Sequence, residues 1–330
     1  AAPFSQGPAR SLRTEGATSW WDWPVMGLLE GIAVFCFNLL VVLFTVPPFL
    51  IAKFSVITAS IKPLTSNSCR RRAVLVSTCL AWRAALLLSC WVRTRVEGLA
   101  AFRSALGQSG RSPVIVANHA SFMDTVLLVT LMPLSKIGKI KMFVSSHLLK
   151  MPFLGTINRA MGHMAVPFKS TESGKFEVDK DRMAEMMQEL EAHIDAGGLA
   201  GWFPEGTMNR GDIAEVQVFR AGGFALAVHL DVEIWCVAFQ GNTVCWPASA
   251  PVGGRPARIG VKISQLCESS HAHIAQGNLD RKDERAACLY LSNDAHNRVQ
   301  RDVSRLVADG YGAPPKSARS ESSKPLLPEK

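Results

Sequence analysis

The sequence predicts an α/β protein with a central, mostly parallel sheet flanked by helices, preceded by an apolar helical membrane anchor. Short strand-like runs alternate with helical patterns from about residue 96 onward, which is typical of α/β order. Residues 31–52, GIAVFCFNLLVVLFTVPPFLIA, have about the length that crosses hydrocarbon. Hydrophobic residues make up 48% of the 330 and charged residues 19%, with a mean hydropathy of +0.14, which disfavours an ordinary soluble enzyme.

Composition divides the chain into four expected segments. Residues 1–19 are small, polar and contain Pro and Gly, so we expect a mobile leader. Residues 20–94 carry the apolar stretches and are expected to form membrane-anchoring helices. A folded α/β domain is expected over 95–312, and the Pro-, Ser- and charge-rich residues 313–330 predict a disordered tail.

The anchor begins with WWDW at 20–23, an aromatic cluster of the kind found at membrane interfaces. Pro47 and Pro48 are expected to kink or end the first apolar helix. The second apolar stretch, residues 73–92, carries Arg83 near its middle, which would cost about 2.5–3.5 kcal/mol if it spanned. The sequence therefore favours one span, or a shallow two-helix anchor with no full crossing.

Charge is unevenly distributed. The chain has a formal net charge of +9, and residues 70–175 hold 15 basic and 3 acidic residues, so this region should attract anionic partners. Only two Tyr occur and no zinc-finger or RNP-like motif is present, which disfavours nucleic acid. The adjoining apolar segments favour anionic lipid, and the run of Arg70, Arg71 and Arg72 is either a solvated flank or a contact for lipid head groups. No obligate protein partner is inferred.

The α/β domain can be followed element by element. One helix has Met183, Met186, Met187, Leu190 and Ile194 on a single face and ends at Gly197 and Gly198. The other expected elements are a strand at 113–117, a helix at 121–132, a strand at 141–146, a helix near 147–160, and buried strands at 199–203 and 232–239.

The stretch NHASFMD, residues 118–124, directly follows the first of these strands. Ser121 and Asp124 have the spacing of a helix capping box. The same spacing also allows Asp124 to reach back to one ring nitrogen of His119 and leave the other as a general base. No G-x-S-x-G elbow or catalytic Cys pattern is present, so we expect Ser121 to be a cap and a substrate hydroxyl to be the proton donor to His119.

A second stretch, FPEGTMN at 203–209, follows another strand. It is either a turn with a solvated Glu or part of a ligand site. Gly206 would allow backbone N–H groups to approach a ligand closely, and Glu205 follows a strand at the sheet edge where open α/β sheets bind ligands.

The two stretches together, N-H-x-x-x-x-D followed about 80 residues later by F-P-E-G-T, resemble the glycerolipid acyltransferases related to 1-acylglycerol-3-phosphate acyltransferase. KMPFLGTINRAMGHMAVPF at 150–168 looks like the second block of that family, and FRAGGFALA at 219–227 is similar to a further block. The resemblance covers about residues 95–245.

The resemblance implies transfer of an acyl group from acyl-CoA to the free hydroxyl of 1-acyl-sn-glycerol-3-phosphate, giving phosphatidic acid, with no metal or bound cofactor. It implies that His119 is the general base and that Asp124 orients it. It places the enzyme in a membrane, by default that of the endoplasmic reticulum with the catalytic domain facing the cytosol, with a plastid or bacterial inner membrane left open. The implied substrate-binding residues are Asn118, Glu205, Gly206 and Thr207.

The chain departs from the family pattern where the acceptor phosphate would bind. Phe168 stands where the second block commonly ends in Arg, with Lys169 next, and Met208 and Asn209 separate the third motif from Arg210. Phosphate binding by Lys169 or Arg210 is therefore a hypothesis. Alternatives are an acyltransferase for another lysophospholipid, a catalytically silent lipid-binding scaffold, and a lipase-like hydrolase.

Other candidate metal ligands have simpler explanations. His271 and His273 form an H-x-H pair with no third ligand nearby, so we expect a solvated face. His163 is expected to be a local structural residue. The eight Cys show no C-x-x-C spacing, which predicts reduced thiols and no structural zinc.

Overall fold

The structure is a computed structural model that describes residues 27–60, 66–170 and 176–312. The expected leader at 1–19, the WWDW cluster and the expected tail at 313–330 lie outside the described residues.

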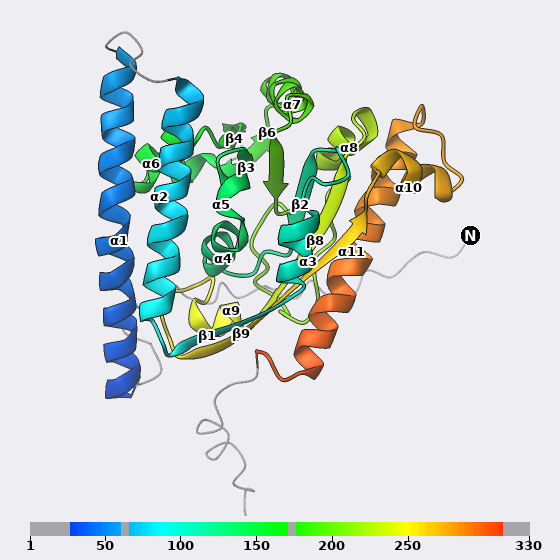
Figure 1. The fold of residues 1–330 in the computed structure, drawn as a ribbon. Coiled ribbons are helices and arrows are strands. Elements are labelled where there is room, and N and C mark those ends of the chain that lie inside the picture. Colours follow the sequence, from blue (N-terminus) through cyan, green and yellow to red (C-terminus); the bar gives the residue numbers. More distant parts are fainter. Residues whose placement is uncertain (1–26, 61–65, 171–175, 313–330) are drawn as a thin grey trace, which may run out of the picture.

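The architecture is a twisted sheet with helices on both faces (Figure 1). Its seven strands follow the order β1-β9-β8-β2-β7-β3-β4, and every neighbouring pair is parallel except β8 and β9. A separate antiparallel pair is formed by β5 (Phe168–Ser170) and β6 (Phe176–Val178). The strands of the main sheet are β1 (Val92–Glu97), β2 (Pro113–Ala117), β3 (Ile140–Ser145), β4 (Met164–Val166), β7 (Leu199–Trp202), β8 (Glu233–Gln240) and β9 (Ala257–Cys267).

Strand β2 lies at the centre of two hydrophobic layers. Ile115 and Ala117 pack into the layer shared with α1 (Leu28–Ser60), α2 (Asn67–Leu88) and α4 (Met123–Leu131). Val114 and Val116 pack into the layer shared with α7 (Lys180–Asp195), α8 (Ala225–His229) and α11 (Glu284–Ala308). All five residues of β2 are buried, as expected for a strand covered on both faces. The predicted α/β class with a mostly parallel sheet and an apolar N-terminal helix is therefore confirmed.

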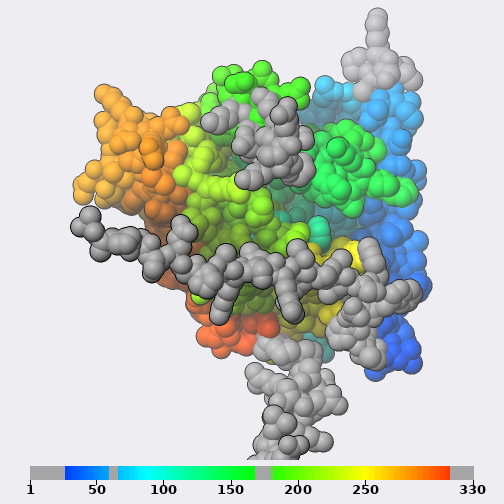
Figure 2. All heavy atoms as spheres, turned by 180° about the vertical axis from the view of Figure 1, so that it is seen from behind, coloured from blue at the N-terminus to red at the C-terminus, as the bar shows by residue number. Residues whose placement is uncertain are grey.

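The helices on the first face include α1 (Leu28–Ser60) and α2 (Asn67–Leu88), which run side by side along one edge of the molecule (Figure 1). Seen from behind, α6 lies against α1 (Figure 2). The remaining helical segments are α3 (Leu99–Ala105), α4 (Met123–Leu131), α5 (Leu134–Ile137), η1 (Ser146–Lys150), α6 (Leu154–Met161), α7 (Lys180–Asp195), η2 (Ala221–Phe224), α8 (Ala225–His229), α9 (Asn242–Cys245), α10 (Ser270–Gln276) and α11 (Glu284–Ala308).

Helix α1 continues through Pro47 and Pro48, so the expectation that they could end it is wrong. Each proline removes one backbone hydrogen bond, but α1 packs against α2 and α6, and this tertiary contact favours continuing the helix. Among the described helices, α1 alone has the length and hydropathy of a membrane span, over Leu28–Thr58 with a mean hydropathy of 2.4.

Helix α2 packs between α1 and the sheet domain, and two of its arginines bind that domain. Arg83 donates from Nε to Thr130 O at 3.0 Å and from Nη2 to Met132 O at 2.6 Å, at the C-terminal end of α4. Arg71 donates to Met161 O at 2.6 Å and to Ile140 O at 2.5 Å. These side chains therefore satisfy backbone carbonyls at element ends, which would otherwise lack partners.

Candidate active site

The first motif forms the loop between β2 and α4. His119 Nδ1 lies 3.0 Å from Asp124 Oδ2, and the Asp124 side chain is fully buried while 18% of the His119 side chain is exposed. A carboxylate can only accept hydrogen bonds, so this contact assigns the ring proton to Nδ1 and leaves the lone pair on Nε2. The orientation predicted for a general base is present.

Asp124 also caps the start of α4. Its Oδ2 accepts from Ala120 N at 2.7 Å and Ser121 N at 2.9 Å. Ser121 Oγ accepts from Met123 N at 3.1 Å and donates to Trp246 O at 2.5 Å, and Ser121 is fully buried. The N-cap of α4 is Phe122, so Ser121 lies one residue before the cap position, not at it as expected, and holds the turn that leads into the helix.

The second motif meets the first because β7 and β2 are parallel neighbours whose C-terminal ends adjoin. Glu205 Oε1 accepts from His119 N at 2.6 Å, and Asn209 N donates to His119 O at 2.7 Å. The Phe203 ring stacks on the imidazole with centroids 4.1 Å apart and planes at 14°. The backbone and the ring of His119 are thus both held by the second motif, residues 203–209.

Glu205 is almost fully buried, with 3% exposed. Burial raises the pKa of its carboxyl to about 7; the nearby Asp124 charge adds to the rise, and hydrogen bonds from the backbone N–H groups of His119 and Gln217 oppose it. Its two oxygens face His119 N and Gln217 N, the second at 3.3 Å. In this geometry Glu205 holds the His119 loop, whereas the sequence predicted contact with a substrate.

Gly206 also differs from the expectation. Its N–H donates to Phe203 O at 3.0 Å, so it closes the turn instead of facing a ligand. Its φ of +74° belongs to the left-handed region, which favours glycine. The Arg220 side chain lies over it, with Nε 2.8 Å from where a Cβ would stand. Arg220 is exposed and donates its backbone N–H to Pro204 O at 2.9 Å.

Of the other predicted binding residues, one is buried between strands and two are exposed on the turn after Glu205. Asn118 is buried and uses Nδ2 and Oδ1 to bind the O and N of Phe239 on β8, at 3.0 and 2.8 Å, so its amide joins two strands. Thr207 and Arg210 are exposed on the turn after Glu205. The backbone of Lys169 lies in β5 opposite Glu177.

Sequence reasoning missed Asn242, which is 1% exposed and donates from Nδ2 to Asp124 Oδ1. A partial signal was available, because Gly241 and Asn242 directly follow a buried strand, where open α/β sheets bind ligands. The sequence does not show which strands are neighbours, so the contact could not be assigned.

The histidines outside the motif have structural partners. His163 is packed among backbone groups, and burial, with the charge of Arg71 as a lesser cause, lowers its pKa to about 3. His271 contacts Val228 O at 3.0 Å, and His273 pairs with Asp294 at 2.7 Å. No group of three or more His, Cys, Asp or Glu residues among those described could hold a metal ion.

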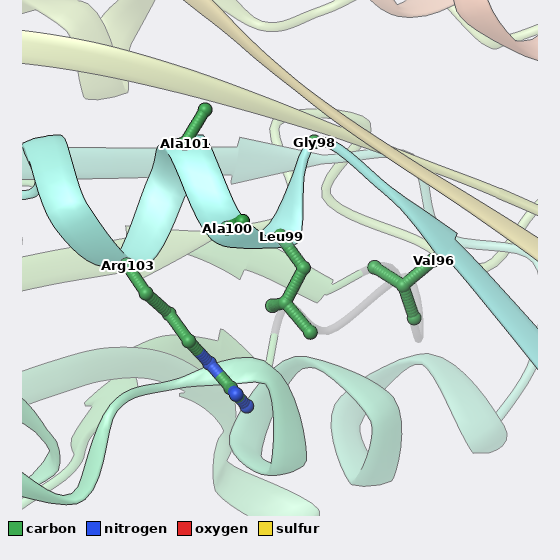
Figure 3. Close-up of a pocket in the computed structure, with 6 residues that line it drawn as sticks. All are labelled: Val96, Gly98, Leu99, Ala100, Ala101 and Arg103. Atoms are coloured by element: carbon green, nitrogen blue, oxygen red, sulfur yellow. The ribbon is translucent and has the colours of Figure 1, made fainter.

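An open depression on the surface does not coincide with the motifs. It is lined by residues of β1 and α3 and contains no predicted site residue (Figure 3). Arg103 extends from α3 toward the neighbouring helices, where its Nε donates to Leu131 O at 3.4 Å. The motif geometry, and not this depression, therefore defines the candidate site.

Comparison with known proteins agrees with the motifs. Residues 93–240 match the family model described as Acyltransferase. No curated protein matches the chain significantly. The crystal structure of the 1-acyl-sn-glycerophosphate (LPA) acyltransferase PlsC from Thermotoga maritima is similar with a TM-score of 0.59 and 19% sequence identity, over 84% of this chain and 98% of that chain. The family match over residues 93–240 and the fold shared with PlsC therefore agree with the resemblance to the glycerolipid acyltransferases that the motif pair predicts.

Proposed function

We propose that this enzyme transfers an acyl group from acyl-CoA to the free hydroxyl of 1-acyl-sn-glycerol-3-phosphate. The observation that carries the proposal is the His119 and Asp124 pair joined to the Pro-Glu-Gly turn. The family match and the fold shared with PlsC, which is an acyltransferase for that acceptor, support the reaction class. No metal or bound cofactor enters the proposed reaction.

In the proposed reaction, His119 Nε2 takes the proton of the acceptor hydroxyl as its oxygen attacks the thioester carbonyl. A C–O bond forms, and the C–S bond then breaks as the intermediate collapses. The thiolate of CoA leaves and takes the proton back from His119, so the base is regenerated. Asp124 supports the transient imidazolium because its buried carboxylate stays within 3.0 Å of Nδ1.

Exposed cations around the turn favour an acceptor that carries phosphate. Arg210 follows the second motif, and Arg220 covers Gly206. Together with Lys169 they are the proposed phosphate ligands. The bidentate fork of Arg suits a terminal phosphate monoester, and a lysophospholipid with a capped phosphate would offer fewer oxygens to it.

The membrane arrangement that we propose is an anchor lying in one leaflet. Glu30 pairs with Arg255 at 3.3 Å, and the Phe49 ring contacts that of Phe153 at 4.8 Å between centroids. These contacts are separated by about 28 Å of helix at 1.5 Å per residue, close to the ~30 Å thickness of hydrocarbon. A crossing helix would carry its folded partners, Arg255 included, into the bilayer, so an in-plane anchor with the domain in the cytosol is the less costly arrangement. The endoplasmic reticulum is the proposed membrane.

The deciding experiment supplies labelled acyl-CoA and a panel of lysophospholipids to the purified full-length protein, with His119→Ala and, as a matched control, His271→Ala. We expect phosphatidic acid from the wild type and the control, and a rate about 10²- to 10⁴-fold lower for His119→Ala.

Other results would separate the alternatives. Equal activity in His119→Ala would refute the base, and preference for another acceptor would move the function to phospholipid remodelling. Free fatty acid without an acceptor would indicate a hydrolase. No product at all would favour a silent lipid-binding scaffold.

A further inference from the structure

Asn242 lies directly behind the catalytic pair, on the side of Asp124 away from His119. Its side chain is buried, and Nδ2 donates to Asp124 Oδ1. The other carboxylate oxygen, Oδ2, accepts from His119 Nδ1 and from the backbone N–H groups of Ala120 and Ser121. Within the described part of the chain, the hydrogen bond from Asn242 is the one that Oδ1 accepts.

The geometry points to Asn242 as a positioning residue that fixes the Asp124 carboxylate and, through it, the ring of His119. This inference rests on the proposed function. Three hydrogen bonds hold Oδ2 and the amide of Asn242 holds Oδ1, so both oxygens oppose rotation of the carboxylate about its bond to Cβ. Without that amide, Oδ1 would be a buried anionic oxygen with no donor, which is strongly unfavourable.

The main chain of Asn242 holds the same loop. Its carbonyl accepts from Trp246 N at 2.9 Å and from Ser121 Oγ at 3.4 Å. Asn242 therefore contacts two parts of the first motif, Ser121 and the carboxylate of Asp124.

Asn242 lies at this position because it follows strand β8. Strand β8 is the parallel neighbour of β2, so the ends of the two strands adjoin. The chain then turns at Gly241, where φ is +82° and an added Cβ would lie 2.2 Å from Arg258 O, so only glycine fits. The matched acyltransferase region ends at residue 240, two residues before Asn242.

The titratable groups around the pair determine how its pH dependence is read. His119 contacts Asp124 directly, and Glu205, whose pKa burial raises to about 7, acts on it through space. On α9, burial raises the pKa of Cys245 to about 12, so that thiol stays neutral. Arg258 on β9 lies 5.6 Å from the ring centre of Tyr311. Dividing each variant's rate by that of the wild type removes the pH dependence that the two proteins share, including the part that comes from Glu205.

Asn242→Asp tests the contact by replacing the amide with a carboxyl group of the same shape. Two carboxylates in hydrogen-bond contact cannot both ionise easily, so at low pH the pair keeps one proton, which can bridge the two oxygens as the amide does. As pH rises the proton leaves, and repulsion turns Asp124 away from His119. We expect the ratio of kcat to that of the wild type to fall about tenfold or more between pH 6 and 9, with KM changing less than about twofold.

Two further variants separate positioning from folding. Asn242→Ala should lower kcat by about 10- to 100-fold at every pH, the range typical of residues that orient a histidine. Asn293→Asp adds the same charge at an exposed position of α11 and should leave the ratio independent of pH. A ratio for Asn242→Asp that stays near one at every pH would overturn the inference.

Thermal melting gives a readout that does not need activity. If the carboxyl group of Asn242→Asp faces Asp124, the carboxyl pair has a raised pKa in the folded state, so Tm relative to the wild type should fall as pH rises. A flat Tm difference would also overturn the inference. If the wild type transfers no acyl group, the proposed function fails, while the melting profile still decides whether the side chain at position 242 holds Asp124.

Discussion

Glu205 makes a quantitative prediction because its charge is buried in the folded state. Its pKa rises from 4.5 to about 7 through burial, so the folded protein binds more protons than the unfolded chain between these values. A raised carboxyl pKa gives stability that is present below pH 4.5 and is lost as pH rises through 7. At 1.36 kcal/mol per pKa unit, the loss is about 3 kcal/mol.

Glu205→Gln removes the charge and keeps the shape, so this pH dependence should disappear. The free energy of unfolding, measured by denaturant titration in detergent at pH 5, 6, 7 and 8, should fall for the wild type relative to the variant by about 2.5 kcal/mol across this range, because part of the loss has already occurred at pH 5. Any constant offset from the altered contact with Gln217 cancels in the slope. Glu185→Gln, on the exposed side of α7, controls for the loss of one carboxyl group.

The reasoning is refuted if the wild type and Glu205→Gln show parallel pH profiles. That result would mean that water or a local opening solvates the carboxylate, and that Glu205 is accessible enough to meet a substrate after all.

Two further predictions concern the anchor. Arg83→Leu removes two donors from the last carbonyls of α4 and should lower the free energy of unfolding by about 1–3 kcal/mol. Arg93→Leu, at an exposed strand position, should leave the free energy of unfolding unchanged. Equal denaturation midpoints for the two variants would contradict this prediction. Phe35 is 68% exposed on α1, and Phe35→Glu should weaken partitioning into anionic vesicles roughly 10- to 100-fold in a flotation assay, with Gln188→Glu on α7 as the charge-matched control. Unchanged flotation of Phe35→Glu would exclude that face as a membrane contact.

The parts of the fold that could be predicted are those with a local signature. The run at 113–117 is a strand buried on both faces, and its unbroken apolar character shows this directly. The helix at α7 has its apolar stripe and ends before Gly197, where φ is +77°. In each case the residues that determine the element lie within it.

The parts that could not be predicted depend on neighbours far away in sequence. From the sequence, Arg83 is a charge in an apolar helix and would be unfavourable in lipid. In the structure it binds backbone carbonyls that lie 47 and 49 residues further along the chain. Strand β1 begins at Val92, inside the segment assigned to the anchor, because its pairing partner β9 lies at Ala257–Cys267. No local sequence pattern predicts such long-range pairings.

The motif residues also differ in whether they are buried against protein groups or partly exposed. Asn118, Asp124 and Glu205 read as chemical groups in the sequence, yet all three are buried and directed at protein partners, whereas His119 keeps part of its ring exposed. A base on a loop would ordinarily sample several positions. Here the N–H of His119 is held by Glu205, its Nδ1 by Asp124 and its ring face by Phe203, so few positions remain.

This arrangement gives a reason for a destabilising carboxylate under the His119 loop. At pH 7 and above, Glu205 costs the folded state about 3 kcal/mol, the same figure that its raised pKa implies. A neutral side chain would avoid that cost, but it would bind the N–H of His119 less strongly than an anionic oxygen at 2.6 Å does. The folded state is thereby less stable, but the His119 loop is already held in the geometry that the proposed proton transfer needs, as is expected at active sites. Glu205→Gln should accordingly lose less stability than the wild type between pH 5 and 8, and it should be the slower enzyme.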